Sequence, residues 1–561
     1  MSCFSAAWSD RRVLRVGLAV CLFSCGLVSH AQSRQTAERP AGATGSAAKT
    51  GSFQIAGRLV NAVTGTPVRQ ATVAALSIEE SRIVQSVISD SEGHFALRNL
   101  PAAKYQLTAS KRGFRTGFYD EHDEFSSAVV TGADQDTAHL TFRLTPGASI
   151  HGVVSSDDGD PVEGARVLLF QRPKHSGPGE RTAQADASVT DDTGAYEFSD
   201  LPPGEFLIAA IAEPWYAIHR NKKNGAAGES VNPALDVAYP VTYYDSTTDE
   251  ATARPIVLAG GSREVADITV HAVPAIHLSI PAPRRQNGDI ARPELQQIVF
   301  GTSITADSAG FLDAMQSGKT SMSGLAPGHY QLTEGDPPRV VDLDLSVSED
   351  VDARAGTAAS AVAGTLRFAD GTPASEEVNL TLDRIDGGSG MNQLVTVAHG
   401  GRFRFENVPS GSWLMWAVGG KPYTVIATRA GRQLRSGNGL ITRDRPVEVA
   451  VTLSKNESRI EGFAEKDGRG VAGVMVVLAP RDPGAWRALL RRDQSDTDGS
   501  FALRDVAPGQ YTVVAIADGW DLDSSRPDEL ARYLPQGTPV TVAPGSRGLI
   551  RLPSPIQIQT R

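Results

Sequence analysis

The sequence is short of cysteine and of catalytic motifs, and both absences limit its chemistry. Its only cysteines are Cys3, Cys21 and Cys25, all within a predicted export signal. Removal of that signal would leave no disulfide, no thiolate nucleophile and no cysteine metal ligand. None of the 11 histidines has a glutamate three residues further on, and no H-E-x-x-H, G-x-S-x-G or Walker motif occurs. The sequence therefore predicts no catalytic residue, no metal site and no cofactor.

Basic tracts and aromatic residues are also scarce. The net charge is −10, and it becomes −12 without the signal, which contains three arginines and one aspartate. An acidic chain without basic tracts argues against nucleic acid as a partner. Aromatic residues make up 6% of the chain, which argues against a sugar-binding aromatic platform on every domain.

The first 31 residues have the pattern of a signal peptide. Arginines 11, 12 and 15 precede an apolar run over residues 16–28, and Ser29-His30-Ala31 offers a small-x-small cleavage site before Gln32. The run is shorter than the ~18 residues of a membrane span, so no transmembrane segment is expected in the mature chain. We expect a periplasmic, cell-surface or extracellular protein. Lipoprotein processing at Cys25 is an alternative.

One unit of sequence, residues 190–206, recurs along the chain. An Asp- and Gly-containing turn leads into an alternating strand, and Leu201-Pro202-Pro203-Gly204 then ends that strand. In all five copies the turn glycine precedes the last residue of the second turn by the same interval. The turn glycines are Gly93, Gly194, Gly318, Gly401 and Gly499. Their period of roughly 100 residues is that of a domain rather than of a solenoid unit.

Short strands separated by turn signals, in units of this length, predict an all-β tandem array of about five antiparallel seven-strand Ig-like or prealbumin-like β-sandwiches. We expect a flexible linker over residues 32–52, rich in Ala, Gly, Ser and Thr. The predicted domains are repeat 1 (53–146), repeat 2 (147–272), a degenerate repeat 3 (273–352), repeat 4 (353–454) and repeat 5 (455–561).

These motifs resemble the carboxypeptidase regulatory-like domain. The order of the resemblance is I-x-G (Ile150-His151-Gly152), G-x-P-V-x-G-A-x-V (159–167), T-D-x-x-G-x-Y-x-F (190–198) and L-P-P-G (201–204). The chain is similar also to collagen-adhesin B-type domains and to starch-binding-like folds. The resemblance implies a transthyretin-like sandwich that serves as an accessory to other modules. The Lys-to-Asn cross-link of B-type domains is not expected, because the first strands around Ile55, Ile150, Val362 and Ile460 contain no lysine.

Repeat 2 carries an insertion rich in aromatic residues. Trp215, Tyr216, Tyr239, Tyr243 and Tyr244 are its candidate ligand-binding residues, because flat rings stack on sugars. The favoured interpretation is that the rings form the insertion's own core, in which case Trp215→Ala should cost roughly 3–5 kcal/mol. The two groups of rings are expected to meet across one loop surface.

Three further segments have competing interpretations. Residues 118–125 mix carboxylates and imidazole, and we read them as a solvated acidic loop rather than a metal site. Residues 483–492 place Trp486, Leu489 and Leu490 on one helical face. They predict a short helix that caps the sandwich edge, with a partner-binding knob as the alternative. Trp413 and Trp416 are expected in the core of repeat 4.

The leading functional hypothesis is a non-catalytic, exported, multi-domain binding or scaffold protein. Its partner would be a polysaccharide or a cell-envelope protein. The alternative is a carbohydrate-binding protein that uses the aromatic insertion of repeat 2. An enzyme whose site assembles from loops without a motif is the third class.

Overall fold

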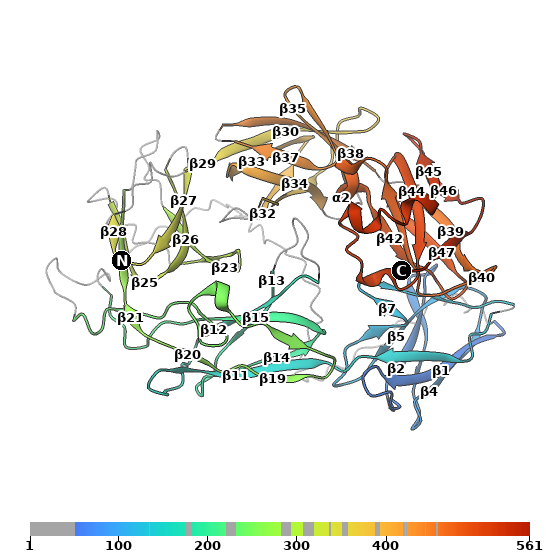
Figure 1. Ribbon diagram of the computed structural model, residues 1–561, viewed down its shortest axis with the longest axis horizontal. Helices are drawn as coiled ribbons and strands as arrows, with labels where there is room; N and C mark the ends of the chain where they lie inside the picture. Colours follow the sequence, from blue (N-terminus) through green and yellow to red (C-terminus); the bar gives the residue numbers. More distant parts are fainter. Residues whose placement is uncertain are drawn as a thin grey trace, which may run out of the picture. The chain divides into compact units, whose positions relative to one another are not determined.

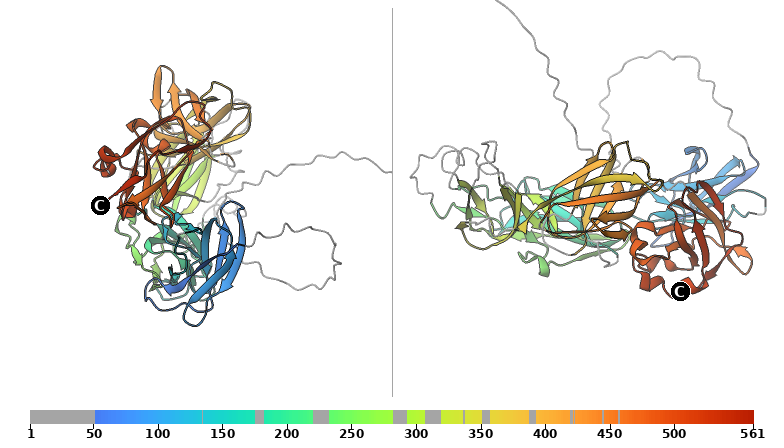
Figure 2. Two further views of the ribbon diagram at one scale, coloured as in Figure 1. Left: turned by 90° about the vertical axis from the view of Figure 1, so that its right-hand side faces the viewer. Right: turned by 90° about the horizontal axis from the view of Figure 1, so that it is seen from above.

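The computed structural model describes residues 51–133, 135–174, 182–219, 232–281, 293–306, 319–335, 338–350, 357–386, 393–418, 421, 423–443, 445–455 and 458–561. The predicted signal, nearly all of the linker and the turn glycine of repeat 3 lie outside them. The described chain is built of strands, with short helical turns only (Figures 1 and 2). The prediction of an all-β tandem array of sandwiches is confirmed.

Repeat 1 pairs two sheets around one core. One sheet has the order β10-β1-β4 and the other β3-β2-β5-β6, with β9 also on β5. The first strand pairs with the last in parallel, and the other pairings are antiparallel. The strands are β1 (Phe53–Asn61), β2 (Thr72–Ser77), β3 (Arg82–Ile88), β4 (His94–Leu100), β5 (Lys104–Ser110), β6 (Gly117–Phe118), β7 (Glu121–His122), β8 (Phe125–Ser126), β9 (Val129–Val130) and β10 (Leu140–Leu144).

Repeat 2 has the same plan and carries its insertion on the second sheet. The sheets are β14-β11-β19, with β20 also on β11, and β13-β12-β15-β17, with β18 on β15. The elements are β11 (Ala148–Ser156), β12 (Arg166–Gln171), β13 (Ala183–Val189), β14 (Ala195–Leu201), β15 (Gly204–Ile211), β16 (Val237–Ala238), β17 (Thr242–Tyr243), η1 (Glu250–Thr252), β18 (Ile256–Leu258), β19 (Arg263–Val265) and β20 (Ile268–Val270).

Repeats 3 and 4 each pair two sheets again. In repeat 3 the strand orders are β25-β22-β28 and β24-β23-β26-β27-β29. In repeat 4 they are β33-β30-β38-β35-β36 and β32-β31-β34-β37. The short β21 (Val273–Pro274) pairs back with β16. The strands are β22 (Ile276–Pro281), β23 (Glu294–Val299), β24 (Thr302–Thr305), β25 (Lys319–Leu325), β26 (Gly328–Gly335), β27 (Pro338–Leu345), β28 (Glu349–Asp350), β29 (Thr357–Ala358), β30 (Ser360–Phe368), β31 (Val378–Arg384), β32 (Gln393–Ala398), β33 (Arg402–Val408), β34 (Gly411–Val418), β35 (Thr424–Ala430), β36 (Gln433–Ser436), β37 (Gly439–Thr442) and β38 (Val447–Ser454).

In repeat 5 the two sheets join, because β47 pairs in parallel with both β39 and β44. The elements are β39 (Ser458–Lys466), β40 (Arg469–Gly470), β41 (Met475–Pro480), η3 (Pro483–Ala485), α2 (Trp486–Leu489), β42 (Arg491–Gln494), β43 (Ser500–Val506), β44 (Gly509–Ile516), η4 (Gly519–Asp521), α3 (Pro527–Leu530), η5 (Leu534–Gln536), β45 (Thr538–Val542), β46 (Gly548–Arg551) and β47 (Ile556–Gln559). Within the described residues, none of the helices is long and apolar enough to cross a membrane.

The repeated sequence signals have local physical causes. Gly194 adopts φ +74°, and Asp191 accepts hydrogen bonds from the amides of Thr193 and Ala195, so the turn into β14 requires this pair of residue types. In the I-x-G motif a Cβ on Gly152 would lie 2.2 Å from the Ala266 carbonyl oxygen. Only glycine at this position therefore lets β11 approach the backbone between β19 and β20 so closely.

Each sandwich buries the alternating apolar residues that the sequence pattern predicts. In repeat 1, Ile55, Phe95, Leu107 and Phe142 belong to one buried cluster. Tyr105, Tyr330 and Tyr511 follow the second turn of repeats 1, 3 and 5, and each donates its hydroxyl to a backbone carbonyl four residues earlier. This bond satisfies a buried polar atom and ties the turn to the strand.

Candidate functional site

The aromatic insertion of repeat 2 is an extension of the second sheet. β17 pairs with β15 so that Tyr243 lies opposite Ala209, and β18 pairs with the start of β15. The chain leaves β15 at Ile211, and residues 220–231 lie outside the described part. The sandwich therefore gains the strands β17 and β18 from the insertion.

Two of the candidate ligand-binding rings are buried in separate clusters. Tyr239 is 8% exposed and lies in the main core of repeat 2, whereas Tyr243 is 5% exposed and lies in a cluster with Leu168 and Phe170. The Tyr243 hydroxyl donates to Glu250 Oε2 at 3.1 Å. Burial, followed by the neighbouring carboxylate of Glu250, raises the pKa of Tyr243. The burial of Tyr239 and Tyr243 agrees with the interpretation that these rings serve as core residues.

Trp215 differs from them, and one prediction about it is wrong. Its side chain is 91% exposed, and its ring meets Tyr216 edge-to-face with centroids 5.8 Å apart. A ring with so little burial cannot cost several kcal/mol when it is removed. The five aromatic residues also do not share one surface, because Tyr239 and Tyr243 are buried in different clusters and Tyr244 packs, half-buried, against the core.

A groove lies between repeats 2 and 3, with a volume of about 770 Å³. Tyr243 and Phe300 form part of its lining, with ring centroids 5.0 Å apart. Glu250 connects the two walls, since its Oε2 also accepts the Phe300 amide at 2.7 Å. His329 Nδ1 and Asp344 Oδ1, also in its lining, are hydrogen-bonded to each other. The groove depends on contacts between two repeats, which sequence periodicity does not reveal.

Two histidines share one carboxylate at the boundary of repeats 2 and 3. His219, which is 6% exposed, contacts Asp236 Oδ1 through Nδ1 at 3.2 Å, and His277 Nε2 contacts Oδ2 at 2.8 Å. Glu213 Oε1 lies 3.3 Å from His219 Nε2. Within the described residues no three His, Cys, Asp or Glu side chains are arranged to hold a metal ion. The arrangement joins the two repeats.

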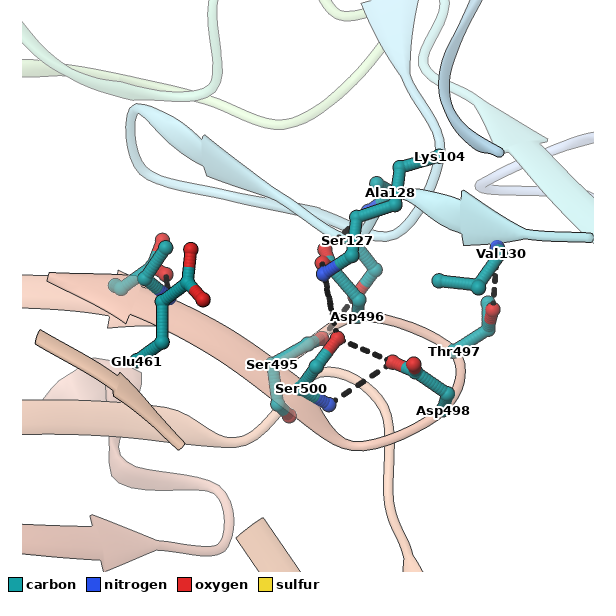
Figure 3. Close-up of polar contacts among 12 residues, drawn as sticks. Lys104, Ser127, Ala128, Val130, Glu461, Ser495, Asp496, Thr497, Asp498 and Ser500 are labelled. Carbon is teal, nitrogen blue, oxygen red and sulfur yellow. Dashed lines mark hydrogen bonds and ion pairs between the residues drawn. The ribbon is translucent and has the colours of Figure 1, made fainter. Parts of the chain in front are cut away.

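A polar network links the first and the last repeat, and we call it the 1–5 joint (Figure 3). Lys104 Nζ lies 2.6 Å from both Asp496 Oδ2 and Ser500 Oγ. The other oxygen of Asp496 accepts the amide of Ala128 at 2.8 Å. These groups come from β5, from the segment after β8, from the turn before β43 and from the first residue of β43.

The backbones of the two repeats also bond directly in the 1–5 joint. The Thr497 amide donates to the Ala128 carbonyl at 3.0 Å, and the Val130 amide donates to Thr497 Oγ1 at 2.9 Å. Ser127, which is fully buried, donates to the Ser495 carbonyl at 2.8 Å. Repeat 1 therefore continues its hydrogen bonding into the Asp-rich turn of repeat 5, which the sequence indicates only as a local turn.

Residues 118–125 belong to the same joint, and Glu121, Asp123 and Glu124 nevertheless stay exposed, as expected of a solvated acidic loop. They form the β7–β8 hairpin. The His122 ring stacks on Trp520 at 5.3 Å between centroids, and Phe125 lies 5.6 Å from the same indole. Arg492 bonds to Asp123 and Glu124. The carboxylates here therefore serve an interface within the chain.

Buried carboxyl groups give the joint an unusual electrostatic character. Burial raises the pKa of Asp493 to about 6, against two backbone amides that lower it. The pKa of Asp496 is also raised, because the desolvation outweighs the attraction of Lys104. Both groups line a cavity of about 220 Å³ with residues of repeat 1, among them Glu124 and Phe125.

The predicted helix of repeat 5 is present as η3 followed by α2. Trp486 and Leu489 are buried, Leu490 packs beside them, and the indole of Trp486 donates to the Ser524 carbonyl at 3.0 Å. Ile426 of repeat 4 packs against the neighbouring core cluster. The helix therefore covers its own sandwich, as expected. In repeat 4, Trp413 is fully buried, and Trp416 is half-buried.

Comparison with known proteins identifies one domain. Residues 54–145 match the family model of the carboxypeptidase regulatory-like domain, which confirms the resemblance. No curated protein matches the chain.

Solved structures with similar parts include the Bacillus anthracis TIE protein, at 10% identity, a TM-score of 0.16 and coverage of 68% of both chains. A streptococcal ancillary pilin has 12% identity and a TM-score of 0.19, over 54% of this chain and 98% of the pilin. Two B repeat units of the Staphylococcus aureus collagen binding protein have 11% identity and a TM-score of 0.12, over 72% of this chain and 99% of theirs. Similarities at this level carry no information on what the chain binds.

Proposed function

With a carboxypeptidase regulatory-like domain at residues 54–145 as the premise, we propose that the chain is a non-catalytic, exported scaffold that presents binding surfaces from serially linked sandwiches. The observation that carries this proposal is the 1–5 joint. A scaffold needs domains that hold one another in fixed contact, and here an ion pair, direct backbone hydrogen bonds and stacked rings couple two repeats nearly 400 residues apart in sequence.

The proposal includes the predicted division of the chain. Repeats 1 to 5, with the boundaries given above, would each fold around a core of their own, behind a signal peptide at residues 1–31. Repeat 5 supports this, because its buried clusters draw almost all their members from residues 460–558. Residues 456–561 expressed alone should unfold cooperatively in a circular dichroism melt. A disordered fragment would contradict the division.

The exported location is tested by fractionation. An intact chain should appear outside the cytoplasm with Gln32 at its N-terminus, whereas lipid attachment would leave Cys25 as the first residue. Retention of the full-length chain in the cytoplasm would contradict export. It would not contradict the scaffold proposal, which the binding experiments test.

A second candidate function is carbohydrate binding at Trp215 and Tyr216. The observation that favours it is the 91% exposure of the indole. Among the described tryptophans, Trp413, Trp486 and Trp520 are at most 6% exposed. Exposing one large ring at a fixed edge-to-face angle to another is unfavourable unless something covers it, and a sugar face is a suitable surface.

A glycan array with three proteins tests this candidate. Wild type should retain a polysaccharide or oligosaccharide, and Trp215→Ala should lose that retention without a change in melting temperature. Ile218→Ala is the matched control, because Ile218 is 50% exposed in the same loop. No retention by wild type would refute the carbohydrate candidate. Binding of an envelope protein by wild type would still support the scaffold proposal.

A further inference from the structure

In each repeat, one edge of the second sheet is formed by the strand that comes directly after that sheet's first strand in the sequence. These five edge strands occupy equivalent places in the fold. The strands are β3, β13, β24, β32 and β42. A free edge exposes unpaired backbone donors and acceptors, and proteins protect it with charges, bulges, short length or a cover.

Two of the five edges are covered by another repeat. β42 carries Arg491, Arg492 and Asp493 and lies under the β7–β8 hairpin, where Arg492 and Gln494 bond to residues 120–127. β24 is four residues long, and its Ile304 is buried in the cluster with Leu168 and Phe170 of repeat 2. The chain therefore already uses this edge as a contact surface.

Two further edges are protected by their own sequence. β3 contains Arg82 and its pairing with β2 shifts register, and β13 contains Asp186 and its pairing with β12 also shifts register. A register shift bends and twists the edge, and a charge that faces another strand is costly to desolvate.

β32 has none of these protections. Its sequence QLVTVA contains no charge and no proline, and it pairs with β31 in unbroken register from Val378–Ala398 to Asp383–Gln393. Val395 is 66% exposed and Val397 is 39% exposed. In the described part of the chain, β31 is its only ladder partner.

The neighbouring strand β33 lies beside this edge. Thr396 Oγ1 donates to the Arg404 carbonyl of β33 at 2.7 Å, which fixes β32 at the corner of the sandwich. On β33, Arg404 and Glu406 are paired with each other, whereas the exposed Arg402 lies at the end of the edge, where its backbone bridges to His399.

We propose that β32 is a self-association edge, on which a second copy of this chain adds its own β32 in antiparallel register. A two-fold axis at Val395 places Val395 opposite its counterpart and Gln393 opposite Val397. Identical copies must present identical charges across such an axis, so an uncharged strand is suited to pair with itself. Of the other four edges, β24 and β42 are covered, β3 has a register shift, and an axis at the central Asp186 of β13 would bring two carboxylates together.

The size of the contact sets its expected strength. Six residues of strand bury much less than the ~1,200 Å² of a stable specific interface, so the association should be weak and concentration-dependent. Cross-strand contacts of β-branched side chains such as Val395 favour the pairing, and they are sensitive to a charge at the axis.

Sedimentation analysis of the full chain tests the proposal. The weight-average mass should rise toward twice the single-chain value over roughly 1–300 μM, a range suited to weak contacts. Val395→Lys should weaken dimerisation at least tenfold. Val257→Lys, in the three-residue β18, is the matched control because Val257 is 67% exposed, and it should leave the dimer unchanged.

A cross-linking experiment identifies the partner strand. In a chain with Cys3, Cys21 and Cys25 replaced by serine, Val395→Cys should form a disulfide-linked dimer on mild oxidation, because antiparallel partners bring Cβ atoms close to disulfide range. Val257→Cys should not. The proposal is overturned if wild type stays monomeric throughout, if Val395→Lys dimerises like wild type, or if the two cysteine variants cross-link equally.

Discussion

The Lys104–Asp496 ion pair should contribute a measurable part of the free energy that docks repeat 1 on repeat 5. The perturbation is Lys104→Ala, which removes two hydrogen bonds of 2.6 Å and leaves the carboxylate of Asp496, whose side chain is 14% exposed, without its cation. Breaking a fully buried pair costs ~3–5 kcal/mol. The Lys104 side chain is 37% exposed, so water can partly replace the cation, and a loss of about 2 kcal/mol is expected.

Hydrogen exchange measures this loss where it occurs. The amides of Ala128, Val130 and Thr497 bond across the joint, so their protection requires docking. A change of about 2 kcal/mol corresponds to roughly 30-fold faster exchange. Amides of the β2–β5 ladder, which lies within repeat 1, should exchange as in wild type.

Lys111→Ala is the control, because this lysine donates to the Arg69 carbonyl and lies over the Phe114 ring, both at the surface of the same repeat and away from the joint. Exchange at the joint should stay within twofold of wild type for this variant. If Lys104→Ala also stays within twofold, the ion pair does not hold the joint. If the β2–β5 amides lose protection equally, the lysine stabilises repeat 1 itself.

Three further predictions concern pH, tryptophan burial and a tyrosine hydrogen bond that recurs in several repeats. Folding raises the pKa of Asp493 to about 6, so the folded state binds this proton more tightly than the unfolded state does. The stabilisation by the protonated carboxyl is therefore complete below the unfolded-state pKa of ~3.9 and is lost as the pH rises through about 6. The melting temperature of repeat 5 should therefore fall between pH 4 and 7, and Asp493→Asn should flatten that slope; an unchanged slope would show that another group titrates. Trp486→Ala should destabilise repeat 5 by about 3–5 kcal/mol, whereas Trp215→Ala should change stability by less than ~0.5 kcal/mol; equal effects in urea titrations would contradict the assigned burial. Tyr511→Phe should cost about 1–2 kcal/mol, since the Ala507 carbonyl loses its buried 2.7 Å partner, and a neutral result would mean that water replaces the hydroxyl.

The fold could be predicted because its signals are local. The turn glycine, its aspartate partner and the alternating strand after it lie within a few residues of one another, and Gly194 has the positive φ that this pattern requires. The helix at Trp486 is similarly encoded by spacing within one turn.

The joint could not be predicted, because its contacts link residues 367 to 396 positions apart and the turn motif of repeat 5 indicates only a local turn. The segment 118–125 has the same composition whether it is solvated or docked on Trp520. The aromatic insertion shows the same limit. Tyr243 and Trp215 are both large rings in one loop, and only the added strand β17 determines that the first is buried and the second is exposed.

Repeat 1 meets its partner for the 1–5 joint only after almost the whole chain has been made. The β7–β8 hairpin, with Phe125, is complete once repeat 1 has left the ribosome, yet Trp520 lies nearly 400 residues further on. At ~5–20 residues per second, that interval lasts roughly 20–80 seconds. During it, the undocked hairpin with its Phe125 ring is available to chaperones, to proteases and to other nascent copies. The completion of repeat 5 thus ends a period of vulnerability for repeat 1, and truncated chains that lack repeat 5 should never leave it.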